Sequence, residues 1–212
     1  MTAPVPGETV DLKKQLPGYA AVRGRFDVLT VPTMAFLMID GHGDPNTSPA
    51  YRDAVSTLFP VAYALKFHSK RELGRDHTVM PLEALWWSDD PAAFTSARDK
   101  TQWHWTLMIL VPEWMSGDDI AAGRLAVERK GGAPALDALR VEPFTEGLAV
   151  QTLHVGPYDD EGPVLERMHR TIIPERDLRM TGRHHEIYLN DARRTAPERL
   201  RTILRQPVAP AG

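Results

Sequence analysis

The chain has no cysteine among its 212 residues. Disulfide bonds, iron–sulfur clusters, cysteine-ligated zinc and thiol catalysis are therefore excluded. An excess of positive charge is also missing, since 25 Lys and Arg residues stand against 28 Asp and Glu residues and give a net charge of −3. A chain so nearly balanced has no overall field that would attract nucleic acid, and we expect no nucleic-acid partner.

Long hydrophobic runs are absent as well. The two longest, Met34–Ile39 and Leu107–Val111, are far too short to cross a bilayer. The first residues show neither the charged nor the apolar region of a secretory signal. What remains is an ordinary globular composition, 42% hydrophobic and 25% charged. We expect a cytoplasmic protein with no membrane partner, and nothing in the sequence predicts its oligomeric state.

The distribution of Pro, Gly and apolar residues divides the chain into an arm and one domain. Residues 1–30 contain several Pro and Gly but few apolar residues, which predicts an N-terminal arm. The domain then covers 31–212. Its two parts, about 31–115 and 116–212, each show a strand, a Gly/Pro turn, a helix and a further strand in the same order. This order suggests two modules related by pseudo-symmetry.

Hydrophobic periodicity and turn residues predict the elements of these modules. Ser48 can cap a helix, and Pro60 is expected to kink that helix or split it in two. Further helices are expected over 118–130 and from Gly162 onward, and a short one over 94–100. Runs of apolar, β-branched and aromatic residues predict strands at 33–40, 79–87, 103–111, 141–144, 148–155 and 184–189.

The C-terminal segment carries a helix signal. Thr195 and Glu198 have the spacing of a capping box and predict a last helix that ends before Pro207. The arginines of this segment, Arg205 among them, would then form a basic, solvent-exposed face.

Four motifs in a fixed order resemble one protein family. They are Ile39–Asn46 (IDGHGDPN), Pro81–Trp87 (PLEALWW), Val155–Tyr158 (VGPY) and His184–Glu198 (HHEIYLNDARRTAPE). Together they resemble the GyrI-like (gyrase-inhibitor-like) small-molecule-binding family, and most closely its stand-alone members without a DNA-binding domain. The resemblance extends over roughly residues 30–207.

This resemblance implies a fold and a function. It implies an α+β fold of two strand-helix-strand-strand modules in a pseudo-twofold arrangement, with a ligand cleft between them. In multidrug-sensing relatives the cleft holds aromatic side chains and a buried acid that bind flat, often cationic molecules. Some stand-alone relatives are hydrolases that open the cyclopropane ring of DNA-alkylating natural products, and their cleft glutamate corresponds to Glu186 here.

Glu186 is the first candidate for catalysis. Because side chains alternate along a strand, Glu186 shares one face with His184 and Tyr188. Ile187 on the other face suits the side covered by helices, so we expect Glu186 to face the cleft. A carboxylate there could accept or donate a proton. The alternative is a structural ion pair with a neighbour such as Arg183.

Glu83 is the second acid. It shares a strand face with Trp87 and could stand on the opposite cleft wall, so that the two carboxylates divide the proton transfers. A structural hydrogen bond is the equal alternative for Glu83. Opening the cyclopropane ring of such an aromatic compound would leave a phenolate, which needs a proton donor. Tyr188, Tyr158 and a protonated Glu83 are all candidates for this donor.

Aromatic residues supply the expected ligand walls. Trp87, with Trp103 or Trp105, should form a flat slot for a planar ligand, while Trp86 packs under a helix. Core packing is the alternative for at least two of the four. The remaining ligand-binding candidates are Tyr158, His104, His184 and Met108.

Metal and cofactor sites are not expected. The zinc-protease motif needs a second histidine four residues after the first, on a helix, and the His184-His185-Glu186 run has none at that spacing. Neighbouring residues of a strand also point to opposite faces, so these three side chains would not converge on one ion. The sequence thus predicts a cofactor-free protein that binds a planar hydrophobic small molecule. We expect it to hydrolyse a cyclopropane-bearing aromatic DNA alkylator, for detoxification or self-protection. The alternative is a non-catalytic protein that binds, sequesters or senses the drug.

Overall fold

The computed structural model describes residues 9–90 and 99–212 and has an α+β fold. Its described residues form four α-helices, α1 (Leu12–Gln15), α2 (Pro49–Glu72), α3 (Gly117–Glu128) and α4 (Gly162–Arg167). The strands are β1 (Asp27–Val31), β2 (Met34–His42), β3 (Leu82–Trp87), β4 (His104–Val111), β5 (Arg140–Phe144), β6 (Gly147–Val155), β7 (Leu178–Met180), β8 (His184–Tyr188) and β9 (Arg201–Pro210).

The six strands expected from the sequence are confirmed, with shifted ends, as β2, β3, β4, β5, β6 and β8. The helix capped by Ser48 and those expected at 118–130 and from Gly162 are confirmed as α2, α3 and α4. The short helix expected over 94–100 falls mostly outside the described residues.

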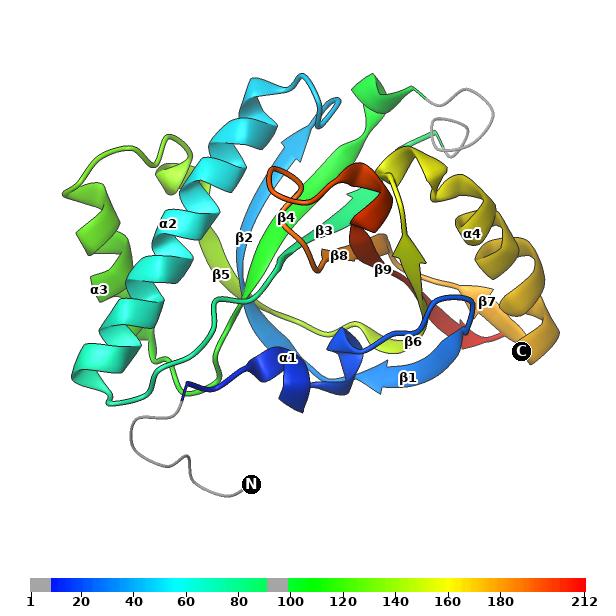
Figure 1. Cartoon of the computed structure of the whole chain (residues 1–212), viewed down its shortest axis with the longest axis horizontal. Helices are drawn as coiled ribbons and strands as arrows, with labels where there is room; N and C mark the ends of the chain where they lie inside the picture. The colour runs from blue at the N-terminus through cyan, green and yellow to red at the C-terminus, as the bar shows by residue number, and fades with distance from the viewer. Residues whose placement is uncertain (1–8, 91–98) are drawn as a thin grey trace.

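All strands pair antiparallel in one sheet, in the order β1-β6-β9-β8-β3-β4-β2-β5, with β7 added to β9 (Figure 1). The strands of the first half, β2, β3 and β4, are neighbours, and so are β6, β8 and β9 of the second. The halves meet where β3 pairs with β8, with Ala84 opposite Glu186. The strand that carries Glu186 therefore lies in the middle of the sheet.

The helices α2 and α4 cover the same face of this sheet. Trp86 and His184 are register partners on β3 and β8, so their side chains share a face. Trp86 contacts Tyr51 of α2, and His184 contacts His169, which follows α4. Figure 1 shows α2 and α4 on either side of β3 and β8. One core cluster lies under α2 and a second, smaller one under α4.

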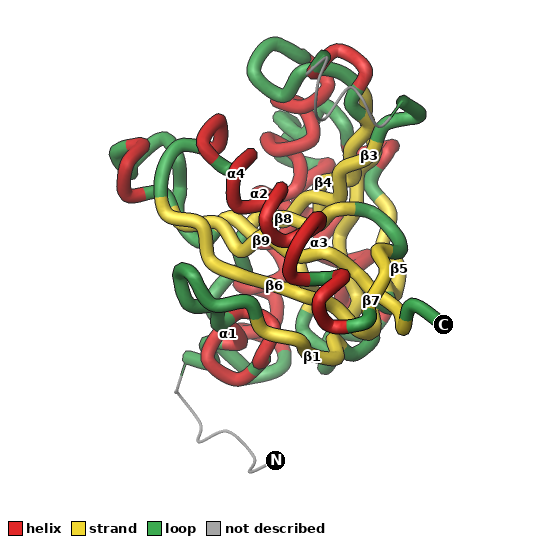
Figure 2. The backbone as a smooth tube through the Cα atoms, turned by 90° about the vertical axis from the view of Figure 1, so that its right-hand side faces the viewer, coloured by secondary structure: helices red, strands yellow, loops and turns green. Residues whose placement is uncertain are grey.

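The N-terminal segment lies against the sheet in the part that the structure describes. Val10 bridges to His77, and Tyr19 is buried. The segment then continues into β1, which pairs with β6. Figure 2 shows α1 beside β1 at the end of this strand layer.

Pro60 does not split its helix, contrary to one form of the prediction. The segment is a single helix of 24 residues with Pro60 inside it. Pro60 removes one backbone N–H and leaves a carbonyl one turn earlier without its usual partner. Pro60 is exposed, so water can reach this carbonyl and the helix continues.

The prediction of a last helix from Thr195 and Glu198 is wrong. The structure has one short 3-10 turn, Pro197–Arg199, followed by β9. Thr202–Leu204 is buried on both faces and flanked by β6 and β8, so the central position in the sheet overrides the local helix signal. Arg205 consequently lies inside the protein and not on a basic surface.

Gly41 is required by the packing of Trp105, which is fully buried. The two residues are register partners on β2 and β4. A Cβ atom built on Gly41 would lie 2.0 Å from the indole ring. Only a residue without a side chain lets the ring lie flat on the backbone there.

No helix among the described residues is long and apolar enough to cross a membrane.

Substitution of Gly41 by Ala should destabilise the protein by about 1–3 kcal/mol, because the Trp105 ring or the backbone must move. Chemical denaturation would measure the loss. Gly117→Ala is the matched control, because Gly117 begins α3 and a Cβ atom there meets nothing within 4 Å. Equal stability of the two variants would contradict this account of the Gly41 contact.

Candidate functional site

Glu186 lies in a hydrogen-bonded group on the helix-covered face of the sheet. The Tyr188 hydroxyl donates to Oε2 of Glu186 at 2.7 Å, and Nε1 of Trp86 donates to the Tyr188 oxygen at 3.1 Å. Nε2 of His184 lies 3.4 Å from Oε1 of Glu186. The Glu186 side chain is 14% exposed, so it is largely shielded but still reachable. A carboxylate held in this way can exchange a proton with a small molecule.

Aromatic rings surround this group. Tyr51 of α2 stacks on Trp86 at 6.2 Å and meets Trp105 edge-on at 5.2 Å. Trp103 meets Trp86 edge-on at 5.6 Å, and Tyr158 meets Tyr188 edge-on at 5.5 Å. We call the rings of Tyr51, Trp86, Trp103, Trp105, Tyr158 and Tyr188 the aromatic cluster. Its members come from α2, β3, β8 and the segments before β4 and α4, as well as β4 itself.

Burial and the charge of Glu186 keep the tyrosines of the cluster protonated. Both effects raise the pKa of Tyr188 well above its usual value and also raise the pKa of Tyr51. Burial, together with Glu161 and Glu186, raises the pKa of Tyr158 to about 12. These three side chains are therefore neutral phenols at physiological pH.

A π-helical turn, Met168–Ile172, continues α4 and brings His169 to the site. The rings of His169 and His184 meet edge-on at 6.2 Å. Burial and the nearby His184 lower the pKa of His169 to about 4, so this ring is neutral at pH 7. His169 is not predicted from the sequence, because no periodicity signal announces a π-turn. Tyr51 is not predicted as a site residue either, because its spacing along the helix is that of an ordinary core stripe.

Glu83 does not stand opposite Glu186, contrary to the expectation. Its register partner on β8 is Ile187, so Glu83 lies on the other face of the sheet. There its Oε1 accepts a hydrogen bond from the Tyr19 hydroxyl at 2.5 Å, and its Oε2 lies 3.0 Å from Nε2 of His185. The inference from Ile187 also fails, because this side chain is buried on the face opposite α2 and α4, whereas the half-buried Glu186 faces these helices.

Trp87 does not form a slot with Trp103 or Trp105, because it too lies on the Glu83 face. The guanidinium of Arg183 lies 3.6 Å above its ring, and His104 stacks on it at 5.5 Å. His104 and Met108 belong to the same face, and Met108 is fully buried opposite Glu83. Of the residues expected at the site, the structure brings together Glu186, Tyr188, His184, Tyr158, Trp86, Trp103 and Trp105.

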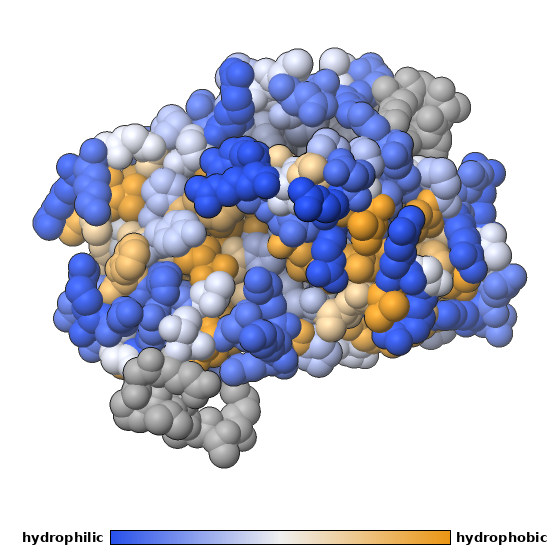
Figure 3. All heavy atoms as spheres, viewed as in Figure 1, coloured by the Kyte–Doolittle hydropathy of each residue, from blue (hydrophilic) through white to orange (hydrophobic). Residues whose placement is uncertain are grey.

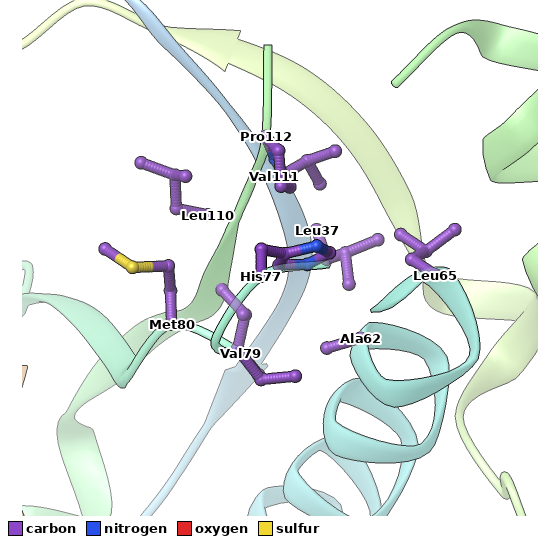
Figure 4. Close-up of a pocket in the computed structure, with 10 residues that line it drawn as sticks. Leu37, Ala62, Leu65, His77, Val79, Met80, Leu110, Val111 and Pro112 are labelled. Atoms are coloured by element: carbon purple, nitrogen blue, oxygen red, sulfur yellow. The ribbon is translucent and has the colours of Figure 1, made fainter. Parts of the chain in front are cut away.

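A small cavity lies elsewhere, beside the C-terminal half of α2 (Figure 4). Its volume is about 10 Å³, room for about one water molecule. Its lining is mostly aliphatic, with His77 as the one titratable side chain, and it contains no member of the aromatic cluster. We therefore regard it as a packing void. In the described part of the chain, no three His, Asp or Glu side chains are arranged to hold a metal ion.

Comparison with known proteins now decides the family. A family model described as the GyrI-like small molecule binding domain matches residues 25–209. The chain belongs to the GyrI-like family. No curated protein matches it.

Several solved structures resemble this GyrI-like chain over their whole length. An uncharacterized conserved protein from Listeria innocua is 35% identical, with a TM-score of 0.85. Two structures described as a hydrolase from the same organism are each 32% identical, with TM-scores of 0.80 and 0.83. All three alignments cover 95% of this chain and 100% of the other. The C-terminal domain of EcmrR, 9% identical with a TM-score of 0.55 over 88% of this chain and 98% of that one, shares the fold alone.

On its other sheet face, this GyrI-like protein buries a chain of charged side chains, which we call the buried charge network. From Glu83 it passes through His185, whose Nδ1 lies 2.9 Å from Oε1 of Glu146. Arg205 then donates to Oε2 of Glu146 at 2.6 Å and to Gln151 at 3.0 Å. Two acids alternate with two bases, so each charge lies beside its opposite and away from water.

The N-terminal segment completes this network. The Tyr19 hydroxyl donates a hydrogen bond to Glu83, and the carbonyl of Gly18 accepts one from Arg205. The carbonyl of Ala20 accepts one from Gln151 at 2.9 Å. These bonds hold the segment on the sheet and satisfy buried polar groups at the same time.

Neighbouring charges dominate the titration of the network. Burial alone would lower the pKa of His185, but the charge of Glu146 and hydrogen bonds to Glu146 and Glu83 outweigh it and raise the pKa to about 9. Burial would raise the pKa of Glu146, but His185 and Arg205 lower it to about 2. Both groups are therefore charged at neutral pH.

Alkaline pH should destabilise the protein as His185 loses its proton. Because its pKa rises from 6.5 to about 9 on folding, its contribution is complete below pH 6.5 and is lost as the pH rises through 9. The free energy of unfolding, measured by urea denaturation, should fall by on the order of 2–3 kcal/mol over this range. His185→Gln should be less stable at pH 6.5 and should lack this fall. The same fall in the variant would assign it to other groups.

Proposed function

We propose that this GyrI-like protein binds a planar, hydrophobic electrophile at the aromatic cluster and hydrolyses it with Glu186 as the base. The observation that carries the proposal is the position of Glu186. Its carboxylate is held by Tyr188, enclosed by aromatic rings and only 14% exposed. The 32% identity to structures described as a hydrolase from Listeria innocua supports a hydrolytic reaction.

The proposed binding site is a cleft between two modules. Along the chain, β2-α2-β3-β4 and β6-α4-β8-β9 repeat the order strand-helix-strand-strand, apart from the short β7 between α4 and β8. In the sheet, β2-β4-β3 is followed by β8-β9-β6. A pseudo-twofold axis would thus pass between β3 and β8, with α2 and α4 as the two walls. Glu186 lies beside this axis. On the face seen in Figure 3, hydrophobic residues reach the surface in separate patches between polar side chains.

We propose a cyclopropane conjugated to an aromatic dienone as the substrate class. Its strained ring opens when water attacks the ring CH₂ and the carbonyl oxygen takes up the electron pair. The water oxygen bonds to this carbon, the carbon–carbon bond breaks, and the dienone becomes a phenolate. Glu186 accepts the proton released by water, and the phenolate oxygen receives a proton from a donor. The product is the hydrated, ring-opened phenol.

The roles of the remaining residues follow from their bonds. The proton of Tyr188 is already donated to Glu186, so Tyr188 acts as a positioning residue for the carboxylate. Tyr158 is 38% exposed and remains a candidate donor at the rim of the cluster. Glu83 and Trp87 lie on the other sheet face and have no part in the proposed site. The aromatic rings would hold the flat ligand for attack and exclude water.

Incubation with an aromatic-fused spirocyclopropyl dienone tests the proposal. We expect several equivalents of hydrated phenol per protein molecule, detected by chromatography and mass spectrometry. Loss of one equivalent without further turnover would instead indicate a protein that sequesters the electrophile.

Glu186→Gln keeps the shape of the side chain but removes the base. Turnover should fall by about 10²–10⁴-fold, the usual effect of losing a general base, while ligand binding persists. Glu83→Gln should lower stability through the buried charge network and leave turnover nearly intact. The opposite result, an active Glu186→Gln protein and an inactive but folded Glu83→Gln protein, would refute the assignment of the base.

Trp86 and Trp87 provide a matched pair on opposite sheet faces. Ligand binding should quench tryptophan fluorescence, and Trp86→Ala should weaken binding by more than about twofold, because a stacking contact contributes ~0.5–1.5 kcal/mol beyond burial. Trp87→Ala should bind as the wild type does. A loss of affinity confined to Trp87→Ala would move the ligand to the other face of the sheet.

A further inference from the structure

Two imidazoles beside Glu186 have buried ring nitrogens without hydrogen-bond partners among the described residues. They are both nitrogens of His184 and Nε2 of His169. Nε2 of His184 is 3.4 Å from Glu186, but Nδ1 has no such neighbour. Buried polar groups in folded proteins are nearly always paired, and leaving one unpaired costs about 1–3 kcal/mol. An unpaired pair of imidazoles next to a candidate base therefore indicates a place for a polar ligand atom.

Two other polar hydrogens close to Glu186 are already in use. Trp86 donates its indole hydrogen to Tyr188, and Tyr188 donates its own to Glu186. Both bonds would have to break before either group could serve a ligand oxygen. His184 and His169 can donate without breaking an existing hydrogen bond, and His184 also lies 3.4 Å from the carboxylate of Glu186.

The π-turn accounts for the position of His169. Within Met168–Ile172 the amide of Ile173 donates to the carbonyl of Met168 at 3.0 Å, five residues back. Such a turn is wider than an α-helical one, and π-turns occur frequently at functional sites. Here it follows α4 and sets the His169 ring against His184. Met168 and Ile173, on either side, are buried in the core under α4 and fix the turn.

We infer that His184 and His169 form the polar end of the ligand site, where they bind the ring oxygen of the substrate and His184 supplies its proton. This inference rests on the proposed function and adds the donor that the hydrolysis needs. The ligand would lie with its flat body against the aromatic cluster and its oxygen at the two imidazoles. The preferred class is a planar enone or dienone and the phenol derived from it.

The proton balance closes with the residues of this site. Water gives one proton to Glu186 and its hydroxide to the ring carbon, and the broken carbon–carbon bond leaves its electron pair on the ring oxygen. His184 donates a proton to that oxygen. One proton transfer from Glu186 to His184, across their 3.4 Å contact or through water, restores both residues. The titratable groups that surround this exchange are His169, Tyr51, Tyr158, Tyr188 and the buried Glu161.

A phenol dye tests the inference without requiring turnover. The probe is 4-nitrophenol, whose phenolate absorbs visible light, so its ionisation can be followed when bound. If imidazole N–H groups face the oxygen, the wild-type protein should bind the phenolate about 10-fold more tightly than the phenol, as expected for a charge-assisted hydrogen bond. This preference should disappear in His184→Gln and weaken in His169→Gln.

Turnover of the spirocyclopropyl dienone provides the second measurement. His184→Gln should lower kcat by about 100-fold, the lower end of the usual effect of a general acid, with little change in KM. His169→Gln should mainly raise KM. His68→Gln is the matched control, because His68 pairs with Asp119 between α2 and α3 and should leave both measurements unchanged.

The outcomes separate this inference from the proposed function. If the dienone is hydrolysed and both His184→Gln and His169→Gln keep the phenolate preference and kcat of the wild type, the inference is overturned and the hydrolase stands. If the wild type shows a phenolate preference that depends on His184 but no turnover, the oxygen site stands and the hydrolase fails. Should His184→Gln not fold, as judged by circular dichroism, His184→Asn and His169→Gln give the same two readings.

Discussion

The pairing of β3 with β8 is the constraint on which the rest of the structure depends. It joins the two halves of the chain into one sheet and fixes Ala84 opposite Glu186. A shift of one residue in this register would turn every side chain of one strand to the other face. Glu186 would then lie among the groups of the buried charge network, and His185 among the aromatic rings. The separation of the two polar assemblies thus rests on one register.

The two faces use polar groups in opposite ways. On one, Glu83, His185, Glu146 and Arg205 compensate one another, and every member has hydrogen-bond partners. On the other, Glu186 is the acid, its neighbours are mostly neutral rings, and two imidazoles keep unpaired nitrogens. A saturated network favours a fixed structure, whereas an unsaturated group can still bind something. This contrast separates the structural acid from the candidate functional one.

The sequence predicts much of this arrangement, but not its orientation. The alternation of side chains along β8 correctly places His184, Glu186 and Tyr188 on one face, because this alternation does not depend on which strands pair with β8. Alternation cannot say which face α2 and α4 cover, and Ile187 misled because the face without these two helices is the more deeply buried one.

Long-range partners explain the other failures. The partners of Glu83, which are Tyr19 and His185, lie 64 and 102 residues away, so no local pattern reveals them. The strand β9 overrides a good helix-start signal because β6 and β8 flank it on both sides. The local pattern around Thr195 describes only the first turn, whereas the sheet decides the ten residues from Arg201 to Pro210.

The hydrogen bond from Trp86 to Tyr188 has a directional consequence. An indole nitrogen can donate a hydrogen bond but cannot accept one. The direction of the two hydrogen bonds that run from Trp86 through Tyr188 to Glu186 is therefore fixed by the chemistry of the indole. The Tyr188 oxygen must receive one hydrogen, and its own hydrogen then points at Oε2. That leaves Oε1, on the His184 side, as the carboxylate atom free to take up a proton. Because the pKa of Tyr188 lies well above its usual value, this orientation persists far into the alkaline range.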